Sequence, residues 1–185
     1  DGMYWQPNPF DTTQAYGTSN GGNYFRIDTR TGDIVDVTPE PAPGEAPYRF
    51  DWTSPIAASA HDPGTVYVAG NRFFVSRDRG LSWTRSADLS RRIDRDTLEI
   101  MGVRGADFTL SPNDGTGSFG EATTLSESPV DPMIVWVGMD DGNLQVSRDG
   151  GATFTEVSGN GPGLPDGTYV SRVAASRSGP GAAYA

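Results

Sequence analysis

Two short stretches of this 185-residue chain share one pattern: "SRDRGLSWT" spans residues 76–84 and "SRDGGATFT" spans residues 147–155. Both place Ser, Asp, Gly and an aromatic residue at the first, third, fifth and eighth positions. An aspartate in such a turn accepts hydrogen bonds from nearby backbone amides, and glycine adopts a backbone angle that a Cβ resists. The pattern predicts a structural hairpin whose aromatic residue packs between neighbouring sheets. The residues concerned are Ser76, Asp78, Gly80 and Trp83, and then Ser147, Asp149, Gly151 and Phe154.

Two catalytic or metal-binding interpretations of these stretches fail on residue types. A calcium loop of the EF-hand kind needs several alternating oxygen ligands and a closing glutamate, whereas "SRDRGLSWT" has one acidic residue. A serine nucleophile needs a base, and the single histidine, His61, lies in a turn of its own, "HDPGT". We therefore expect no metal site and no cofactor.

The sequence around the two stretches is also repeated. "HDPGTVYVAG" precedes the first stretch and "VDPMIVWVGM" precedes the second, a weaker copy lies at 15–37, and another copy begins near 169. Alternating apolar residues, β-branched residues and Gly/Pro/Asp turns predict four short strands per copy. Such units in series predict an all-β fold made of β-propeller blades, each with four antiparallel strands. One partial propeller domain, 1–185, would hold about three blades and part of another, at roughly 3–38, 52–87, 121–158 and 169–185.

These residues carry a resemblance. The two stretches resemble Asp-boxes, or BNR repeats, and "DWTSPIAASAHDPGTVYVAG" with "GLPDGTYVSRVAAS" is similar to bacterial sortilin-like proteins, also described as glycosyl hydrolase-like BNR-repeat proteins. Xyloglucanase-type hydrolases carry related propellers. The resemblance implies exported propellers with more blades than this sequence holds. We therefore expect an incomplete ring that is closed by further blades of a longer chain or by self-association, because an open arc exposes unpaired strand edges.

The charge and composition of the chain disfavour some classes of partner. The net charge is −10 and the sequence pI is about 4.4, which disfavours nucleic acid as a partner. No apolar run reaches the roughly 18 residues of a membrane span, and there is no cysteine. We expect a secreted, periplasmic or cell-surface protein whose signal peptide is not in this segment.

Ligand residues are expected at the rim opposite the two hairpins. That rim would be built from 38–52, 70–72, 87–120, 139–143 and 158–170. Alignment of the inner strands places Asp51-Trp52, Gly120-Glu121 and Thr168-Tyr169 at equivalent positions. Exposed aromatic rings near carboxylates suit a sugar or peptide, because rings stack on apolar faces and acids accept hydroxyl or amide hydrogens. The predicted binding residues are Trp52, Tyr169 and Arg172, although aromatic residues at such positions also pack between blades.

Two functions from different classes follow. The first is a binding propeller that recognises a glycan, a peptide or a protein at the channel rim. The alternative is a glycoside hydrolase of xyloglucanase or β-glucanase type, which needs two facing carboxyl groups; Asp51 and Glu121 are the tentative pair, with Asp107 and Asp114 as weaker candidates. A sialidase is disfavoured, because Arg49, Arg104 and Arg172 show no recognisable spacing for gripping a carboxylate.

Overall fold

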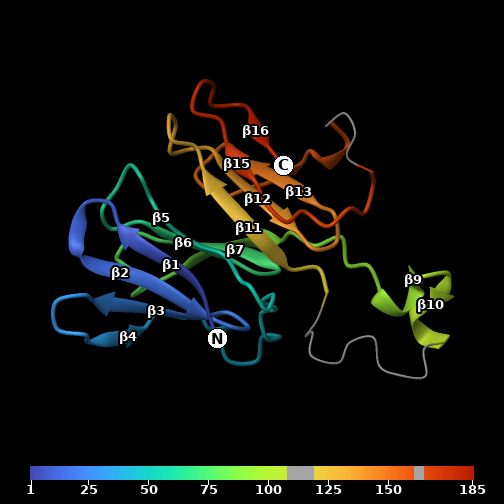
Figure 1. Cartoon of the computed structure of the whole chain (residues 1–185), viewed down its shortest axis with the longest axis horizontal. Coiled ribbons are helices and arrows are strands. Elements are labelled where there is room, and N and C mark those ends of the chain that lie inside the picture. The colour runs from blue at the N-terminus through green and yellow to red at the C-terminus, as the bar shows by residue number, and fades with distance from the viewer. Residues whose placement is uncertain (108–118, 161–164) are drawn as a thin grey trace.

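The computed structural model describes residues 1–107, 119–160 and 165–185. Strands dominate these residues, and the helical elements among them are three short 3₁₀ turns, η1 (Arg95–Thr97), η2 (Gly105–Asp107) and η3 (Ser158–Asn160). Three antiparallel sheets of four strands follow one another in an arc (Figure 1). Within each sheet every strand pairs with the next one along the chain, which confirms the predicted fold class of β-propeller blades.

The strands have the following bounds. The first blade contains β1 (Gly2–Asn8), β2 (Asp11–Ser19), β3 (Asn23–Asp28) and β4 (Ile34–Asp36). The second contains β5 (Ile56–Ala58), β6 (Val66–Ala69), β7 (Arg72–Ser76) and β8 (Thr84–Asp88). The third contains β11 (Ala122–Glu127), β12 (Val135–Met139), β13 (Leu144–Ser147) and β14 (Thr155–Glu156). A two-stranded sheet, β15 (Ala174–Ala175) and β16 (Ala183–Tyr184), follows the third blade.

The hydrophobic core lies between the blades. Alternate side chains of a strand point to opposite faces of its sheet, so each central strand supplies apolar residues to two neighbours. Tyr67 and Phe73 of the second blade meet Val135 and Val137 of the third in one buried cluster. Equivalent clusters join the first blade to the second, and the third blade to β15 and β16. The blades therefore stabilise one another face to face.

Each Ser-Asp-Gly stretch forms a closed hydrogen-bonded turn between the third and fourth strands of its blade. The Ser76 hydroxyl donates to Asp78 Oδ1 at 2.7 Å and accepts from the Gly80 amide at 2.7 Å. Asp78 Oδ1 also accepts from the Ser82 amide at 2.8 Å. The second turn repeats these contacts through Ser147, Asp149, Gly151 and Thr153. Hydrogen bonds to the ionised carboxylate lower the pKa of both aspartates to about 2.

The glycine and the aromatic residue of each turn contact the preceding blade. Gly80 has φ of 88°, and a Cβ there would lie 2.7 Å from the Val37 side chain. Gly151 has φ of 96°, and a Cβ there would lie 2.2 Å from the Phe73 ring. The Trp83 indole donates to the Val37 carbonyl at 2.9 Å. The turns thus close a hairpin and also fit it against the neighbouring sheet.

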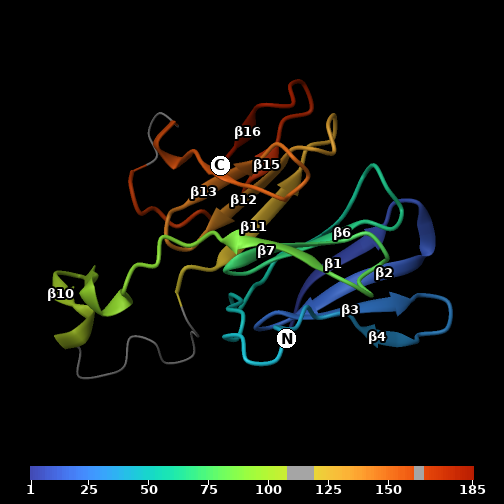
Figure 2. The same cartoon turned by 180° about the vertical axis from the view of Figure 1, so that it is seen from behind.

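The segment that links the second and third blades leaves the arc before it returns. It contains η1, a small hairpin of β9 (Glu99–Ile100) and β10 (Val103–Arg104), and η2. Both views show these elements apart from the blades (Figures 1 and 2). The helical structure of this segment is therefore limited, among the described residues, to 3₁₀ turns beside a hairpin. No helix among the described residues has the length and apolar character that a membrane crossing requires.

One face of the first blade is not covered by a sheet in the described structure. Pairing places Trp5 and Phe25 in one cross-strand row, and Ile27 and Ile34 in the next row on the same face. Trp5 is 52% exposed and Ile34 is 66% exposed. On the second and third blades the corresponding face packs against the preceding blade. The first blade, at one end of the arc, therefore presents an apolar sheet face to solvent (Figure 1).

Replacing Asp78 or Asp149 with Ala should lower the melting temperature by roughly 2–4 °C each, because the turn amides lose their acceptor. Glu40→Ala is the matched control, since Glu40 is exposed and outside both turns. The measurement is thermal unfolding by circular dichroism. Melting curves for both aspartate variants that coincide with that of Glu40→Ala would contradict the structural role of the turns.

Candidate functional site

Three acidic side chains converge where the inner strands begin. One carboxylate oxygen from each of Asp51, Glu121 and Asp140 lies within 4.8 Å of the other two. Asp51 precedes β5, Glu121 directly precedes β11, and Asp140 directly follows β12. The structure thus brings the tentative pair Asp51 and Glu121 together and adds a third carboxylate from the loop at 139–143.

Backbone amides hold this acidic group in place. Asp140 Oδ1 accepts from the amides of Gly120 and Glu121 at 3.0 and 2.7 Å, and Asp51 Oδ1 accepts from the Thr53 amide at 2.7 Å. Gly120 has φ of 81°, and a Cβ there would lie 2.7 Å from Ser90 Cβ. Glycine is therefore required for the turn that brings Glu121 to the cluster.

The three carboxylates have different surroundings. Glu121 is only 2% exposed. Burial raises the pKa of Asp140 to about 6. The negative charges of Asp141 and Asp51 also raise this pKa, whereas the two backbone amides that donate to Asp140 lower it. A carboxyl group with this pKa carries a proton for part of the time near neutral pH, when an ordinary aspartate is ionised. The cluster can therefore combine a proton donor with carboxylate acceptors.

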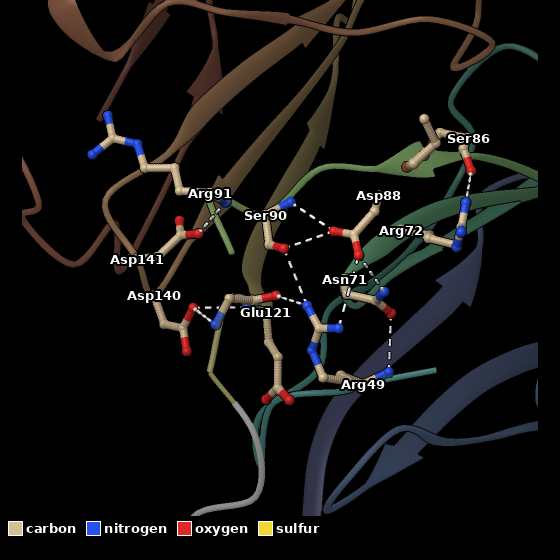
Figure 3. A network of polar contacts seen from close by, with 12 residues as sticks. Arg49, Asn71, Arg72, Ser86, Asp88, Ser90, Arg91, Glu121, Asp140 and Asp141 are labelled. Atoms are coloured by element: carbon tan, nitrogen blue, oxygen red, sulfur yellow. Dashed lines mark hydrogen bonds and ion pairs between the residues drawn. The ribbon is translucent and has the colours of Figure 1, made fainter. Parts of the chain in front are cut away.

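A polar network supports the wall beside the cluster (Figure 3). The Arg49 guanidinium donates to the Ser90 hydroxyl at 3.1 Å and to the Gly120 carbonyl at 3.4 Å, and it forms an ion pair with Asp88. The Arg91 amide donates to Asp141 at 2.7 Å. Among the residues that the structure describes, no arginine forms an ion pair with Asp51 or Asp140. The network thus orders the backbone around the cluster and leaves those two carboxylates available.

Two exposed aromatic residues accompany the acids. Trp52 follows Asp51 and is 49% exposed, and Tyr169 is 52% exposed. Burial raises the pKa of Tyr169, and the charges of Asp51 and Asp140 raise it further. The phenol of Tyr169 therefore lies close enough to the cluster for the charges of Asp51 and Asp140 to affect its pKa. Each residue is about half exposed and therefore leaves surface open to a ligand.

Below this opening, the inner strands enclose a cavity of about 330 Å³. Its lining comes from β1, β5, β11 and the segment before β15. The lining residues that matter below are Tyr4, Gln6, Thr124, Ser126, Glu127 and Arg172. The predicted binding residue Arg172 therefore lines the channel, one level further in than the aromatic opening.

Glu127 at the cavity wall joins the second and third blades. Its Oε1 accepts from the Ser59 and Tyr67 hydroxyls, each at 2.7 Å, and its Oε2 accepts from the Ala60 amide at 2.7 Å. His61, in the adjacent exposed turn, places Nε2 at 2.9 Å from the Ser128 carbonyl. Both contacts bridge blades, and they lie at the end of the inner strands remote from the acidic cluster.

The other sequence candidates lie elsewhere. Asp107 is in η2, in the segment that leaves the arc. Asp114 falls outside the described residues. Arg104 belongs to β10, away from Arg49 and Arg172, so the described structure assembles no cluster from these three arginines. Asp140 is not among the site residues that the sequence predicts. Its loop, 139–143, belongs to the predicted rim and is two residues longer than the corresponding loop of the second blade.

No family model matches this chain. A curated relative is an oligoxyloglucan-reducing end-specific xyloglucanase from Emericella nidulans, which is 29% identical over 115 residues, 58% of this chain and 12% of the relative. The matched segment thus covers about an eighth of that protein's length.

Solved structures of similar fold include three propeller proteins. YCF48 bound to D1 peptide matches with a TM-score of 0.46 and 15% identity over 83% of this chain and 39% of that one. A GH74 enzyme from Niastella koreensis matches with a TM-score of 0.30 and 14% identity over 91% and 37%. The GH74 xyloglucanase from Xanthomonas campestris matches with a TM-score of 0.36 and 12% identity over 82% and 35%.

Replacing Asp140 with Asn should raise the free energy of unfolding near pH 8 by roughly 1–2 kcal/mol, after allowance for solvent screening. The folded-state pKa of about 6 exceeds the ordinary 3.8. This group therefore contributes stability below about pH 4, and the contribution is lost as pH rises through 6. Urea unfolding of the wild type and of Asp140→Asn between pH 4 and 8 measures the difference. Parallel pH profiles for the two proteins would refute the raised pKa.

Proposed function

We propose that this part of the chain forms a carbohydrate-recognition site at the channel opening, with a β-glucan as the ligand class. The observation that carries the proposal is the convergence of the Asp51, Glu121 and Asp140 carboxylates, with exposed Tyr169 close enough for the charges of Asp51 and Asp140 to raise its pKa and exposed Trp52 next to Asp51 in the chain. Carboxylates accept hydrogen bonds from sugar hydroxyls, and aromatic rings cover the apolar faces of sugar rings. This combination suits a neutral oligosaccharide better than an isolated ion.

The choice of a β-glucan draws on the curated relative. That protein is a xyloglucanase, and the matched segment includes more than half of this chain.

Because β-glucan polymers are too large to cross a membrane, we further propose that the protein is exported to the cell surface, the periplasm or the medium. We assign the two Ser-Asp-Gly turns to the Asp-box type, on their pattern and on the shared Ser-Asp-Gly hydrogen bonds, within a sortilin-like propeller.

Binding of xyloglucan oligosaccharides and cellotetraose, measured by isothermal titration calorimetry, tests the proposal. Asp51→Asn should weaken binding by about tenfold, because it removes a charged acceptor for sugar hydroxyls, and Glu121→Gln should weaken it by a similar factor, because buried Glu121 supplies part of the negative charge of the cluster. Glu40→Gln, which makes the same charge change at an exposed site outside the cluster, should bind as the wild type does.

Three controls sharpen this test. Carboxylate oxygens are also donors for calcium, so the titrations are run with calcium and with a chelator. Binding that the cluster variants leave unchanged would contradict the proposed site. If the protein binds peptides on an array and binds neither oligosaccharide, the ligand class is a peptide and the proposal of a glycan is wrong.

A second candidate function, hydrolysis of the glycan, is favoured by the raised pKa of Asp140 beside two other carboxyl groups. Glycosidases pair a protonated acid with a carboxylate. In this assignment Asp140 donates the proton to the leaving oxygen, and Asp51 or Glu121 acts as the carboxylate. Reducing-sugar release that Asp140→Asn abolishes, while calorimetric affinity is retained, would support hydrolysis. Binding without product release in the wild type would leave recognition as the function.

We also propose that the uncovered face of the first blade binds a further four-stranded blade. The row of Trp5 and Phe25 corresponds to the face that packs against a preceding blade in the second and third blades. A blade of the same kind is the occupant that continues these two interfaces. When the chain is studied alone, a second copy supplies that blade.

Sedimentation velocity tests this assembly. The chain should self-associate as its concentration increases. The double variant Trp5→Glu, Ile34→Glu should remain monomeric, because each substitution would bury a charge in the apolar interface. Met101→Glu changes a still more exposed apolar residue in the β9–β10 hairpin and should leave association unaltered. A stable monomer at all concentrations would exclude this use of the face.

A further inference from the structure

The channel cavity contains one positive charge that the described residues do not neutralise. Arg172 is exposed and lines the cavity. No hydrogen bond or ion pair joins its guanidinium to the part of the chain that the structure describes. Other arginines, such as Arg49, Arg85 and Arg91, contact an acceptor. Among the described residues, Arg77, Arg148 and Arg177 also form no side-chain hydrogen bond or ion pair, but of these and Arg172 it is Arg172 that lines the cavity.

The acidic residue of the cavity wall does not compensate this charge. Both carboxylate oxygens of Glu127 already accept hydrogen bonds from Ser59, Tyr67 and Ala60 of the second blade. The other polar lining residues, including Gln6, Thr124 and Ser126, are neutral. A guanidinium in a concave, partly enclosed place without a carboxylate partner favours an anionic group from outside.

The position of Arg172 along the channel follows from its backbone contacts. The Val173 amide donates to the Thr124 hydroxyl at 3.1 Å, and the Ala175 amide donates to the Ser126 hydroxyl at 3.0 Å, so this segment runs alongside β11. Val170 contacts Thr123 and Val173 contacts Thr124, so Arg172, three residues beyond Tyr169, lies beside Thr124 of β11. The channel is thus acidic at its opening and cationic inside.

We propose that Arg172 forms a subsite for the carboxylate of an acidic sugar, a uronic-acid unit of the glycan whose neutral units lie at the opening. This proposal rests on the proposed carbohydrate function. A guanidinium binds a carboxylate through two parallel N–H donors. Gln6 of β1, which also lines the cavity, offers a side-chain amide for the sugar hydroxyls.

The acidic opening does not prevent this binding. The clustered carboxylates belong to residues that precede β5 and β11 or follow β12, whereas Arg172 lies beside Thr124 within β11, so a carboxylate bound at Arg172 is nearer to the guanidinium than to the cluster. The attraction to Arg172 acts at contact distance and is screened less than the repulsion. The two charge patterns therefore select a ligand with neutral units at one end and an acidic unit at the other.

The test uses two probes that differ in the carboxylate alone, cellotetraose and the tetramer carboxylated at C6. The wild type should bind the carboxylated tetramer about tenfold more tightly, and this preference should shrink toward about 1 M salt. Arg172→Gln should abolish the preference and retain binding of neutral cellotetraose, whereas Arg172→Lys should retain part of the preference. Arg177→Gln is the matched control, since Arg177 is exposed and outside the cavity lining.

The outcomes separate the acidic subsite at Arg172 from the carbohydrate function on which it rests. Equal affinity for both tetramers in the wild type would overturn the acidic subsite and leave the carbohydrate function standing. Absence of binding by either tetramer and by xyloglucan oligosaccharides would overturn both. Equal loss of the preference in Arg172→Gln and Arg177→Gln would assign the effect to net charge and overturn the subsite.

Discussion

The structure depends on the close approach of each Ser-Asp-Gly turn to the blade that precedes it. At Gly80 and Gly151 a side chain would occupy space that Val37 and Phe73 already fill. The serine and aspartate satisfy the amides of the turn internally, so the turn needs no partner from solvent or from a ligand. The contact is therefore possible only when glycine and the short polar residues occur together. This explains why the same spacing recurs in two blades whose other residues differ.

This constraint also decides which end of the channel is free for recognition. The turns lie at the end where the inner strands finish: the Arg79 amide donates to the Gly64 carbonyl, and the Gly150 amide donates to the Met133 carbonyl. Backbone groups at that end are engaged in joining strands. The opposite end begins each inner strand after a connecting segment, and packing restricts its side chains less. Asp51 and Glu121 reach a common point there because both lie in the segment that leads into the first strand of a blade.

Much of this arrangement could be predicted from the sequence because it rests on local or repeated features. The bonds among Ser76, Asp78 and Gly80 span four residues, and alignment of repeats was enough to place Asp51 and Glu121 at equivalent strand starts. Asp140 was not predicted, because its raised pKa arises from burial and from charges on Asp141 and Asp51 that only the folded chain brings together. The hairpin of β9 and β10 was not predicted either, since its two-residue strands show no alternation.

The channel illustrates how one repeat can carry recognition without disturbing the fold. Trp52, Glu121 and Tyr169 occupy one level of the inner strands in the repeat alignment, and Thr124 and Arg172 occupy a level further in. The backbone at these levels is fixed by apolar residues on the blade faces, such as Val68 and Val137. Side chains that line the channel contribute little to those faces, so their charge can differ from blade to blade at small cost in stability. The inner strands can therefore carry a ring or an acid at one level and a guanidinium at the next without a change in the apolar faces that hold the blades together.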